Sequence, residues 1–247
     1  MTDAADALAY PAHEVGVAAH LVRAGDLGDE ERIAGPDAHH LARVRRSRIG
    51  EQLTVSDGLG QWRRYEIRSI SNDGIDVVAC GSQRRSPPPR RRVTVAAALS
   101  KGTKIETIAQ HLAEIGVARF VPFVAHRSVL RLDEADRAKL DARLAATVRG
   151  AAMQSRRAWL CEIVPTTSFS GLSSVLSGDV LVATIDGDGA ALAGCPGELS
   201  VVTGPEGGFD PTEREAFATW GARDWSVSDA VLRAETAPLV AATLAMA

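Results

Sequence analysis

The chain of 247 residues is 45% hydrophobic and carries a formal net charge of −3. This length can bury a substantial core in one large domain or two small ones, and the charge excludes a polycationic protein. Cys80, Cys161 and Cys195 lie far apart without a Cys-x-x-Cys spacing, which argues against a disulfide framework or a zinc site and favours a reducing cytoplasm.

No segment of the sequence has the pattern of a targeting peptide or a membrane span. The first twenty residues lack a basic start followed by a continuous apolar stretch, so no signal peptide is expected. No run approaches the roughly 20 apolar residues that cross a bilayer. We therefore expect a soluble, cytoplasmic protein without a membrane partner.

Positive charge is concentrated near the start of the chain. Residues 1–34 contain two Arg against seven acidic residues, a local charge of −5, whereas residues 35–92 contain twelve Arg against six, a local charge of +6. A general preference for Arg over Lys explains why lysine is scarce, but it does not explain this clustering. The favoured interpretation is a basic face that binds a polyanion.

The first third of the chain has the pattern of a small β-barrel. Short strands are predicted at residues 52–56, 64–69 and 75–80, with turn residues between them. Trp62 and Tyr65 either stack on bases or, more commonly, fill the barrel core. Three prolines at residues 87–89, flanked by arginines, exclude helix and predict an extended connector. The predicted domains are residues 1–86 and 87–247.

After the connector, strands and helices alternate along the chain. Strands are predicted at residues 93–99, 120–125, 180–185, 199–203 and 224–227, and helices at residues 104–117, 133–153, 211–220 and 235–247. This alternation predicts an α/β fold with a mostly parallel sheet and helices on both of its faces.

Two loops in the last fifth of the chain are the most informative feature. Residues 204–208 read Gly-Pro-Glu-Gly-Gly after one predicted strand, and residues 231–237 lead from another strand into the terminal helix. We expect these two strands to be adjacent. Ligands of open α/β sheets bind outside the carboxyl ends of the strands, and glycines let the backbone approach a ligand closely. A tight strand-to-helix turn without a ligand is the alternative.

Charged side chains near the helix ends allow both structural and functional interpretations. Arg233 and Glu235 either form an ion pair that closes the last helix, or lie near an anion and a transferable proton respectively. Arg156 follows the long helix, where positive charge favours the helix dipole without any ligand. It could equally face a site, because a strand is predicted to follow.

A basic helical turn precedes the first predicted strand. His39, Arg43 and Arg46 lie in this turn, and Arg64 lies on a neighbouring strand. A histidine pair without cysteine or carboxylate at ligand spacing is weak support for a metal. Phosphate contact by arginine is the favoured interpretation.

Taken together, these motifs resemble the RsmE family of bacterial methyltransferases, which modify uridine N3 in small-subunit (16S) ribosomal RNA and belong to the SPOUT superfamily. The glycine segment at 204–208 combined with Leu-Arg-x-Glu-Thr-Ala at 232–237 is specific for this family. Weaker landmarks occur in family order over residues 33–245: the turn at 38–44, Gly50-Glu51, Asp57-Gly58, Glu114-Ile115-Gly116-Val117, Arg127-Ser128-Val129, and Gln154-Ser155 followed by Arg156 and Arg157.

The resemblance implies a PUA-like RNA-binding barrel, a C-terminal domain with a deep trefoil knot, and a homodimer that acts on ribosomal RNA or the 30S subunit. It implies S-adenosylmethionine as the cofactor and requires no metal. The implied cofactor contacts are Thr184, Ile185, Asp186, Thr203, Gly204, Pro205, Gly207, Gly208, Val227, Ser228, Val231, Leu232, Arg233 and Ala234. The expected RNA contacts are His39, Arg43, Arg46, Arg64 and Arg127.

Uridine N3 carries a proton, so its methylation requires a base. Our hypothesis assigns this role to Glu206 or Glu235, with Arg156 or Arg233 stabilising charge on the uracil oxygens. Two features depart from the family pattern: Met153 stands where a Glu is usual, and residues 7–10 replace an Arg-Phe-Phe-like first strand. The alternatives are methylation of another RNA or of a ribose, and a non-catalytic RNA-binding or assembly factor.

Overall fold

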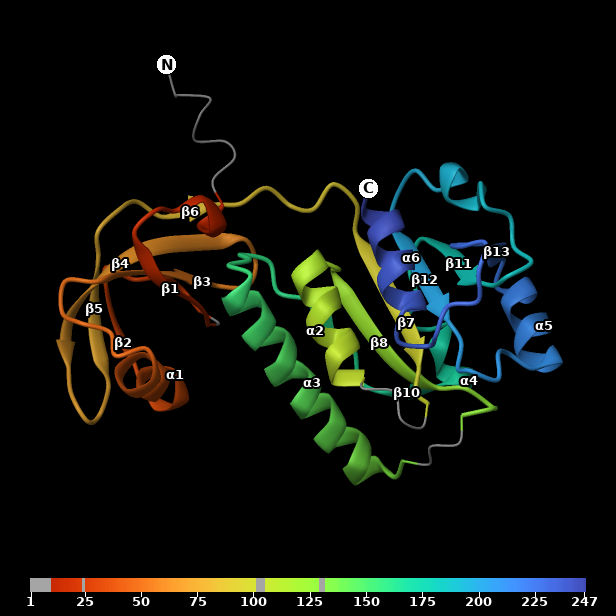
Figure 1. The fold of residues 1–247 in the computed structure, drawn as a ribbon, viewed down its shortest axis with the longest axis horizontal. Coiled ribbons are helices and arrows are strands. Elements are labelled where there is room, and N and C mark those ends of the chain that lie inside the picture. The colour runs from red at the N-terminus through yellow and green to blue at the C-terminus, as the bar shows by residue number, and fades with distance from the viewer. Residues whose placement is uncertain (1–9, 24, 101–104, 129–131) are drawn as a thin grey trace, which may run out of the picture. The chain divides into compact units, whose positions relative to one another are not determined.

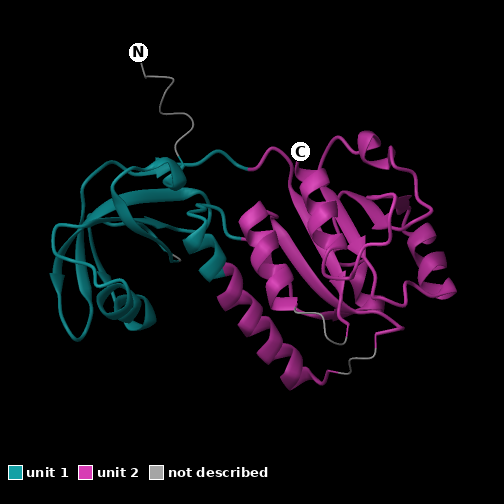
Figure 2. Ribbon diagram, viewed as in Figure 1, with its two compact units in different colours: residues 1–88, 149–160 teal, residues 89–148, 161–247 magenta. Residues whose placement is uncertain are grey.

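The computed structural model describes residues 10–247 except 24, 101–104 and 129–131. The chain forms two compact units, which Figure 2 distinguishes by colour: residues 1–88 with 149–160, and residues 89–148 with 161–247. The boundary lies inside the proline connector, close to the predicted one. The sequence did not predict that residues 149–160 belong to the first unit. Residues 7–9, Lys104 and Val129, which entered the predictions, lie outside the described residues.

The first unit is built on a six-stranded sheet (Figure 1). The strand order is β1 (Val17–Val22), β3 (Gln52–Ser56), β4 (Gln61–Ile70), β5 (Ile75–Ala79) and β2 (Glu30–Ile33), with β6 (Arg84–Arg85) paired to β4. β1 runs parallel to β3, and the other pairs are antiparallel. The predicted strands at 52–56, 64–69 and 75–80 are confirmed. Trp62 and Tyr65 are both buried, so they fill the core.

The basic turn forms a short helix, α1 (Gly35–His39), that continues as a π-helical turn, η3 (His40–Val44). Leu41 and Ala38 are its buried side chains and belong to the apolar cluster of the sheet. Arg46, just beyond the turn, has a φ of 55°, in the left-handed region that few residues other than glycine adopt. Burial of one side of this segment leaves its arginines on the exposed side.

Residues 149–160 join the first unit through polar contacts with the sheet. The long helix α3 (Glu134–Gln154) ends where Arg157 N–H donates to the Ala152 carbonyl oxygen at 2.9 Å. Arg156 occupies the left-handed position of this helix end, with a φ of 53°. Its guanidinium donates to the backbone carbonyl oxygens of Glu14 and Val17 at 3.2 and 3.0 Å. The side chain of Arg156 therefore fastens the helix end to the start of the first unit.

The second unit has a seven-stranded sheet in which every pair is parallel. The order is β10 (Thr167–Ser168), β8 (Arg119–Val124), β7 (Val93–Ala98), β12 (Leu199–Thr203), β11 (Asp179–Ala183) and β13 (Arg223–Trp225), with β9 (Glu162–Ile163) paired to β8. β11 lies between β12 and β13, so our expectation that the last two strands are adjacent was wrong. Because all three run parallel, their following loops still share one edge.

Helices cover both faces of this sheet. Every residue of the central strands β7 and β12 is buried, as expected for a parallel sheet. α2 (Ile105–Ile115) and α6 (Ala237–Met246) pack against each other, and α6 packs against β7 and β12. Side chains of α4 (Phe169–Leu172) and α5 (Pro211–Thr219) join another apolar cluster with β8, β11 and β12. The predicted α/β fold is confirmed, and the knot stays a prediction.

None of the helices in the described residues is long and apolar enough to cross a membrane.

His20 is a buried connection between β1 and the 149–160 segment. Its ring Nε2 lies 3.1 Å from the Arg157 carbonyl oxygen and its Nδ1 lies 2.8 Å from Thr54 Oγ1. A carbonyl oxygen only accepts, so Nε2 carries the proton and Nδ1 accepts from the Thr54 hydroxyl. Burial lowers the pKa of His20 to about 4. The neutral ring is therefore the form that fits this site.

This pKa predicts that acid destabilises the first unit. Because the pKa is lower in the folded state than the usual 6.5, stability is complete above pH 6.5 and falls as the pH drops towards 4. The expected loss is about 3 kcal/mol. Urea denaturation at pH 7 and pH 4 measures it. His20→Gln cannot titrate and should flatten the pH dependence, so equal slopes for the variant and the wild type would contradict the assignment.

Candidate functional site

The loops that follow β11, β12 and β13 enclose one cavity of about 430 Å³. All but one of the residues that the resemblance assigned to a cofactor line it: Thr184, Ile185, Asp186, Thr203, Gly204, Pro205, Gly208, Val227, Ser228, Val231, Leu232, Arg233 and Ala234. Gly207 is the exception, and Phe209 and Arg214 are lining residues that the sequence analysis missed. The parallel sheet thus brings together segments that are up to fifty residues apart in the chain.

The geometry of the 204–208 loop favours glycine at positions 204 and 208. Gly208 has a φ of 64° and donates its N–H to the Pro205 carbonyl oxygen at 2.8 Å, which closes a tight turn. A Cβ on Gly204 would lie 3.1 Å from the ring of Phe209. The loop therefore exposes backbone to the cavity at positions where a side chain would meet strain or a neighbour.

A few polar groups mark an otherwise apolar lining. Thr184 Oγ1 is buried and has no hydrogen-bond partner among the described residues. An orphaned buried hydroxyl costs free energy, so this group destabilises the ligand-free structure. Glu206 accepts a hydrogen bond from Ser100 Oγ at 3.0 Å. Arg214, in the first turns of α5, adds an exposed positive charge.

The four predicted catalytic residues have different positions. Glu206 and Arg233 line the cavity. Glu235 is not a lining residue, but its carboxylate lies 3.9 Å from the Arg233 guanidinium, whose side chain is 84% exposed. Arg156 belongs to the first unit, where its guanidinium already donates to two carbonyl oxygens. The ion pair that the sequence allowed between Arg233 and Glu235 is therefore present, and Arg156 lies at the end of the long helix. The catalytic roles of these residues stay predictions.

The predicted RNA contacts separate into available and engaged arginines. Arg43 and Arg46 are exposed, and no partner of either guanidinium is found within the described part of the chain; His39 is exposed as well. Arg64 instead forms an ion pair with Glu14 and donates to the Val15 carbonyl oxygen at 3.4 Å. Arg127 donates to the Gly207 carbonyl oxygen at 2.7 Å. Arg43 and Arg46 are thus the stronger candidates for phosphate contact.

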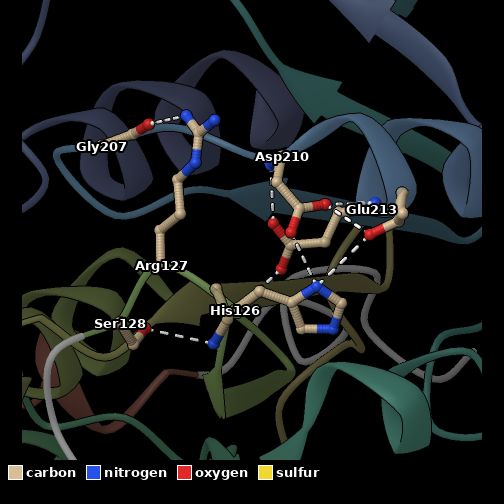
Figure 3. A network of polar contacts seen from close by, with 8 residues as sticks. His126, Arg127, Ser128, Gly207, Asp210 and Glu213 are labelled. Carbon is tan, nitrogen blue, oxygen red and sulfur yellow. Dashed lines mark hydrogen bonds and ion pairs between the residues drawn. The ribbon is translucent and has the colours of Figure 1, made fainter.

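One group of side chains has the composition of a metal site. His126, Asp210 and Glu213 each offer a ligand atom, and these atoms lie within 4.8 Å of one another. Their carboxylate oxygens, however, already accept hydrogen bonds from the protein: Asp210 and Glu213 form the capping box of α5, and His126 donates to both (Figure 3). Protein donors account for this cluster without a cation.

Comparison with known proteins supports the interpretation of both units. A family model described as "RNA methyltransferase domain" matches residues 86–246, and one described as "RNA methyltransferase PUA domain" matches residues 33–80. The ribosomal RNA small subunit methyltransferase E of Bacillus subtilis is 30% identical over 223 residues, which cover 85% of this chain and 86% of that protein. The Mycobacterium tuberculosis protein of the same name is 34% identical over 235 residues, with 87% and 86% covered.

Solved structures agree with this match. A probable rRNA methyltransferase from Porphyromonas gingivalis superposes with a TM-score of 0.75 at 28% identity, over 91% of this chain and 95% of that one. Ribosomal RNA small subunit methyltransferase E from Neisseria gonorrhoeae, bound to S-adenosyl methionine, superposes with a TM-score of 0.80 at 21% identity, over 92% and 96%. The second likeness shows the shared fold.

The orphaned hydroxyl of Thr184 generates a stability prediction. Thr184→Val removes the hydroxyl and keeps the shape of the side chain, so the free energy of unfolding of the ligand-free protein should rise by about 1 kcal/mol. Chemical denaturation measures this change. Thr166→Val is the matched control, because the Thr166 hydroxyl donates to Asp141 and its loss should destabilise the protein. A Thr184 variant as destabilised as the control would show that its hydroxyl has a partner.

Proposed function

Because the chain belongs to the RNA methyltransferase family that includes ribosomal RNA small subunit methyltransferase E, we propose that it methylates uridine N3 of 16S ribosomal RNA with S-adenosylmethionine as methyl donor. The observation that carries this proposal is the cavity at the carboxyl edge of the parallel sheet, lined by the two signature loops. A ribosomal substrate assigns the activity to the cytoplasm.

The cavity has suitable properties for the cofactor. Its volume of about 430 Å³ falls within the range of small-molecule sites, roughly 300–1,000 Å³. Val231 and Leu232 offer apolar surface to an adenine ring, and Val231 is 78% exposed in the free protein. The glycine backbone permits close approach of a ligand. Arg214 provides a positive charge for the carboxylate of the methionine moiety.

The residues of this chain have two tasks at the reacting base. When bound, S-adenosylmethionine supplies an electrophilic methyl group. Glu206 or Glu235 removes the N3 proton of the uracil, a contribution of roughly 10²–10⁴-fold in rate. Arg233 stabilises the negative charge that develops on the uracil oxygens. Arg233 is favoured over Arg156 for this task, because it lines the cavity and the Arg156 guanidinium is engaged with carbonyl oxygens.

In this proposal, the first unit binds the RNA. N3 lies on the Watson–Crick edge, so the target uridine must be unpaired or extruded when it reacts. Exposed arginines of the turn after α1, Arg43 and Arg46, contact phosphates and fix the position of the RNA without reading its sequence.

We further propose that the protein acts as a homodimer. α6 is apolar on all sides rather than amphipathic, and Leu244 near its end is 42% exposed. Ile185 at the cavity is 61% exposed. A second copy would cover such apolar surface. Light scattering tests this, since a dimer has twice the chain mass of 26.1 kDa.

Mass spectrometry of nucleosides tests the proposed reaction. After incubation of unmodified 16S rRNA and 30S subunits with the protein and S-adenosylmethionine, new 3-methyluridine is expected. If Glu235 is the base, Glu235→Gln should lower turnover by roughly 10²-fold or more while leaving cofactor affinity nearly unchanged, because it removes a proton acceptor and keeps the size of the side chain. Unchanged turnover would eliminate Glu235 and leave Glu206 as the base. A ribose-methylated product would indicate the alternative methyltransferase, and absence of cofactor binding would indicate a non-catalytic RNA-binding factor.

The engaged and available arginines make different contributions to RNA binding. Arg43→Gln and Arg46→Asn should each reduce the slope of log affinity against log salt by about 1, because each removes one phosphate contact. Asn is chosen at position 46 because it tolerates the left-handed backbone. Arg64→Gln is the matched control and should change the slope less, since Glu14 neutralises Arg64. Fluorescence anisotropy with rRNA fragments measures all three; equal effects would contradict the distinction.

A further inference from the structure

The glycine loop at 204–208 is held in shape by contacts from outside the loop. Three of its five residues are glycines, which lose more conformational freedom than any other residue on ordering. Within the loop, one backbone hydrogen bond from Gly208 to Pro205 closes the turn. Such a segment needs external contacts if it is to present a fixed backbone to a ligand before the ligand arrives.

Arg127 provides the first of these contacts. Its guanidinium Nη1 donates to the Gly207 carbonyl oxygen at 2.7 Å (Figure 3). Its aliphatic stem also covers the glycine, because a Cβ on Gly207 would lie 3.6 Å from Arg127 Cδ and 3.7 Å from Arg127 Cβ. Gly207 is the one predicted cofactor residue that does not line the cavity, and this contact gives its carbonyl a different partner.

His126 provides a second contact, with two residues that follow the loop. Its backbone N–H donates to Glu213 Oε1 at 2.8 Å, and its ring Nδ1 lies 2.9 Å from Asp210 Oδ2. Hydrogen bonds from the Thr212 hydroxyl and the Glu213 N–H hold the pKa of Asp210 well below its usual range. The ionised carboxylate only accepts, so Nδ1 of His126 is the donor.

Residues 126 and 127 are themselves firmly placed. They follow β8 directly, and Ser128 closes the turn, with its N–H donating to the Ala125 carbonyl oxygen at 3.0 Å and its Oγ accepting from the Ala125 N–H at 3.1 Å. Ser128 is 3% exposed. The turn therefore links a buried strand to Gly207 near the end of the glycine loop and to Asp210 and Glu213 just after it.

We propose that Arg127 and His126 are positioning residues that fix the glycine loop in the conformation that binds the cofactor. This inference rests on the proposed function and assigns Arg127 a task other than the phosphate contact that the sequence predicted. The two residues act through the loop backbone. Neither is among the residues that line the cavity.

The test is calorimetric titration of the full chain with S-adenosylmethionine. Arg127→Met keeps the aliphatic stem and removes the donor, and we expect the dissociation constant for the cofactor to rise about tenfold, equivalent to about 1.4 kcal/mol. Arg127→Lys restores a charged donor and should recover part of this loss. Arg92→Met is the matched control: Arg92 pairs with Glu198 just before β7, at the amino edge of the sheet, and its loss should leave cofactor affinity unchanged.

Two further measurements separate positioning from other roles. In the methylation assay, Arg127→Met should raise KM for the cofactor and leave kcat at saturating cofactor nearly unchanged, because only binding depends on the loop. Asp210→Ser keeps a helix-capping side chain but removes the acceptor of His126, so it should also weaken cofactor binding, with little change in melting temperature.

The outcomes are distinguishable. Wild-type protein that does not bind S-adenosylmethionine would overturn the proposed function. Wild-type binding combined with unchanged affinity in folded Arg127→Met would overturn the positioning role alone. If this variant lost rRNA affinity and about 1 unit of salt slope while keeping cofactor affinity, Arg127 would be a phosphate contact instead.

Discussion

The parallel direction of β11, β12 and β13 is the constraint on which the candidate site depends. Parallel strands place all their carboxyl ends at one edge, so three loops from separate parts of the chain meet there without being neighbours in sequence. The strands can stay parallel because helices cover both faces and connect one edge to the other. The same parallel arrangement therefore buries the sheet and brings the loops of the cavity together.

The site combines a rigid base with loops that have little intrinsic order. The central strands are fully buried, whereas the lining segments contain glycines and exposed apolar residues such as Ile185 and Val231. Order in the glycine loop therefore comes from side chains anchored elsewhere, at the end of β8 and in the capping box of α5. A preordered loop reduces the entropy lost when a ligand binds.

In the first unit, whether an arginine can contact a phosphate depends on its neighbours in space rather than on its position in the sequence. The basic segment carries a local charge of +6, but Arg64 and Arg84 both pair with Glu14, and Arg63 pairs with Asp29. Both acidic partners belong to the acidic first segment of the chain. Arg43 and Arg46, in and just beyond the turn after α1, are exposed and have no such acidic partner among the described residues.

Local patterns in the sequence determined three strands of the first unit and five of the second, the alternation that makes an α/β fold, the proline connector and the two signature loops, because periodicity and turn chemistry act over a few residues. Only the tertiary structure decided that β11 separates β12 from β13, that residues 149–160 join the first unit, and that Arg214 lines the cavity. It also decided that Arg127 meets Gly207 and Arg64 meets Glu14. These contacts join residues 50 to 80 positions apart, and no local pattern encodes such pairings.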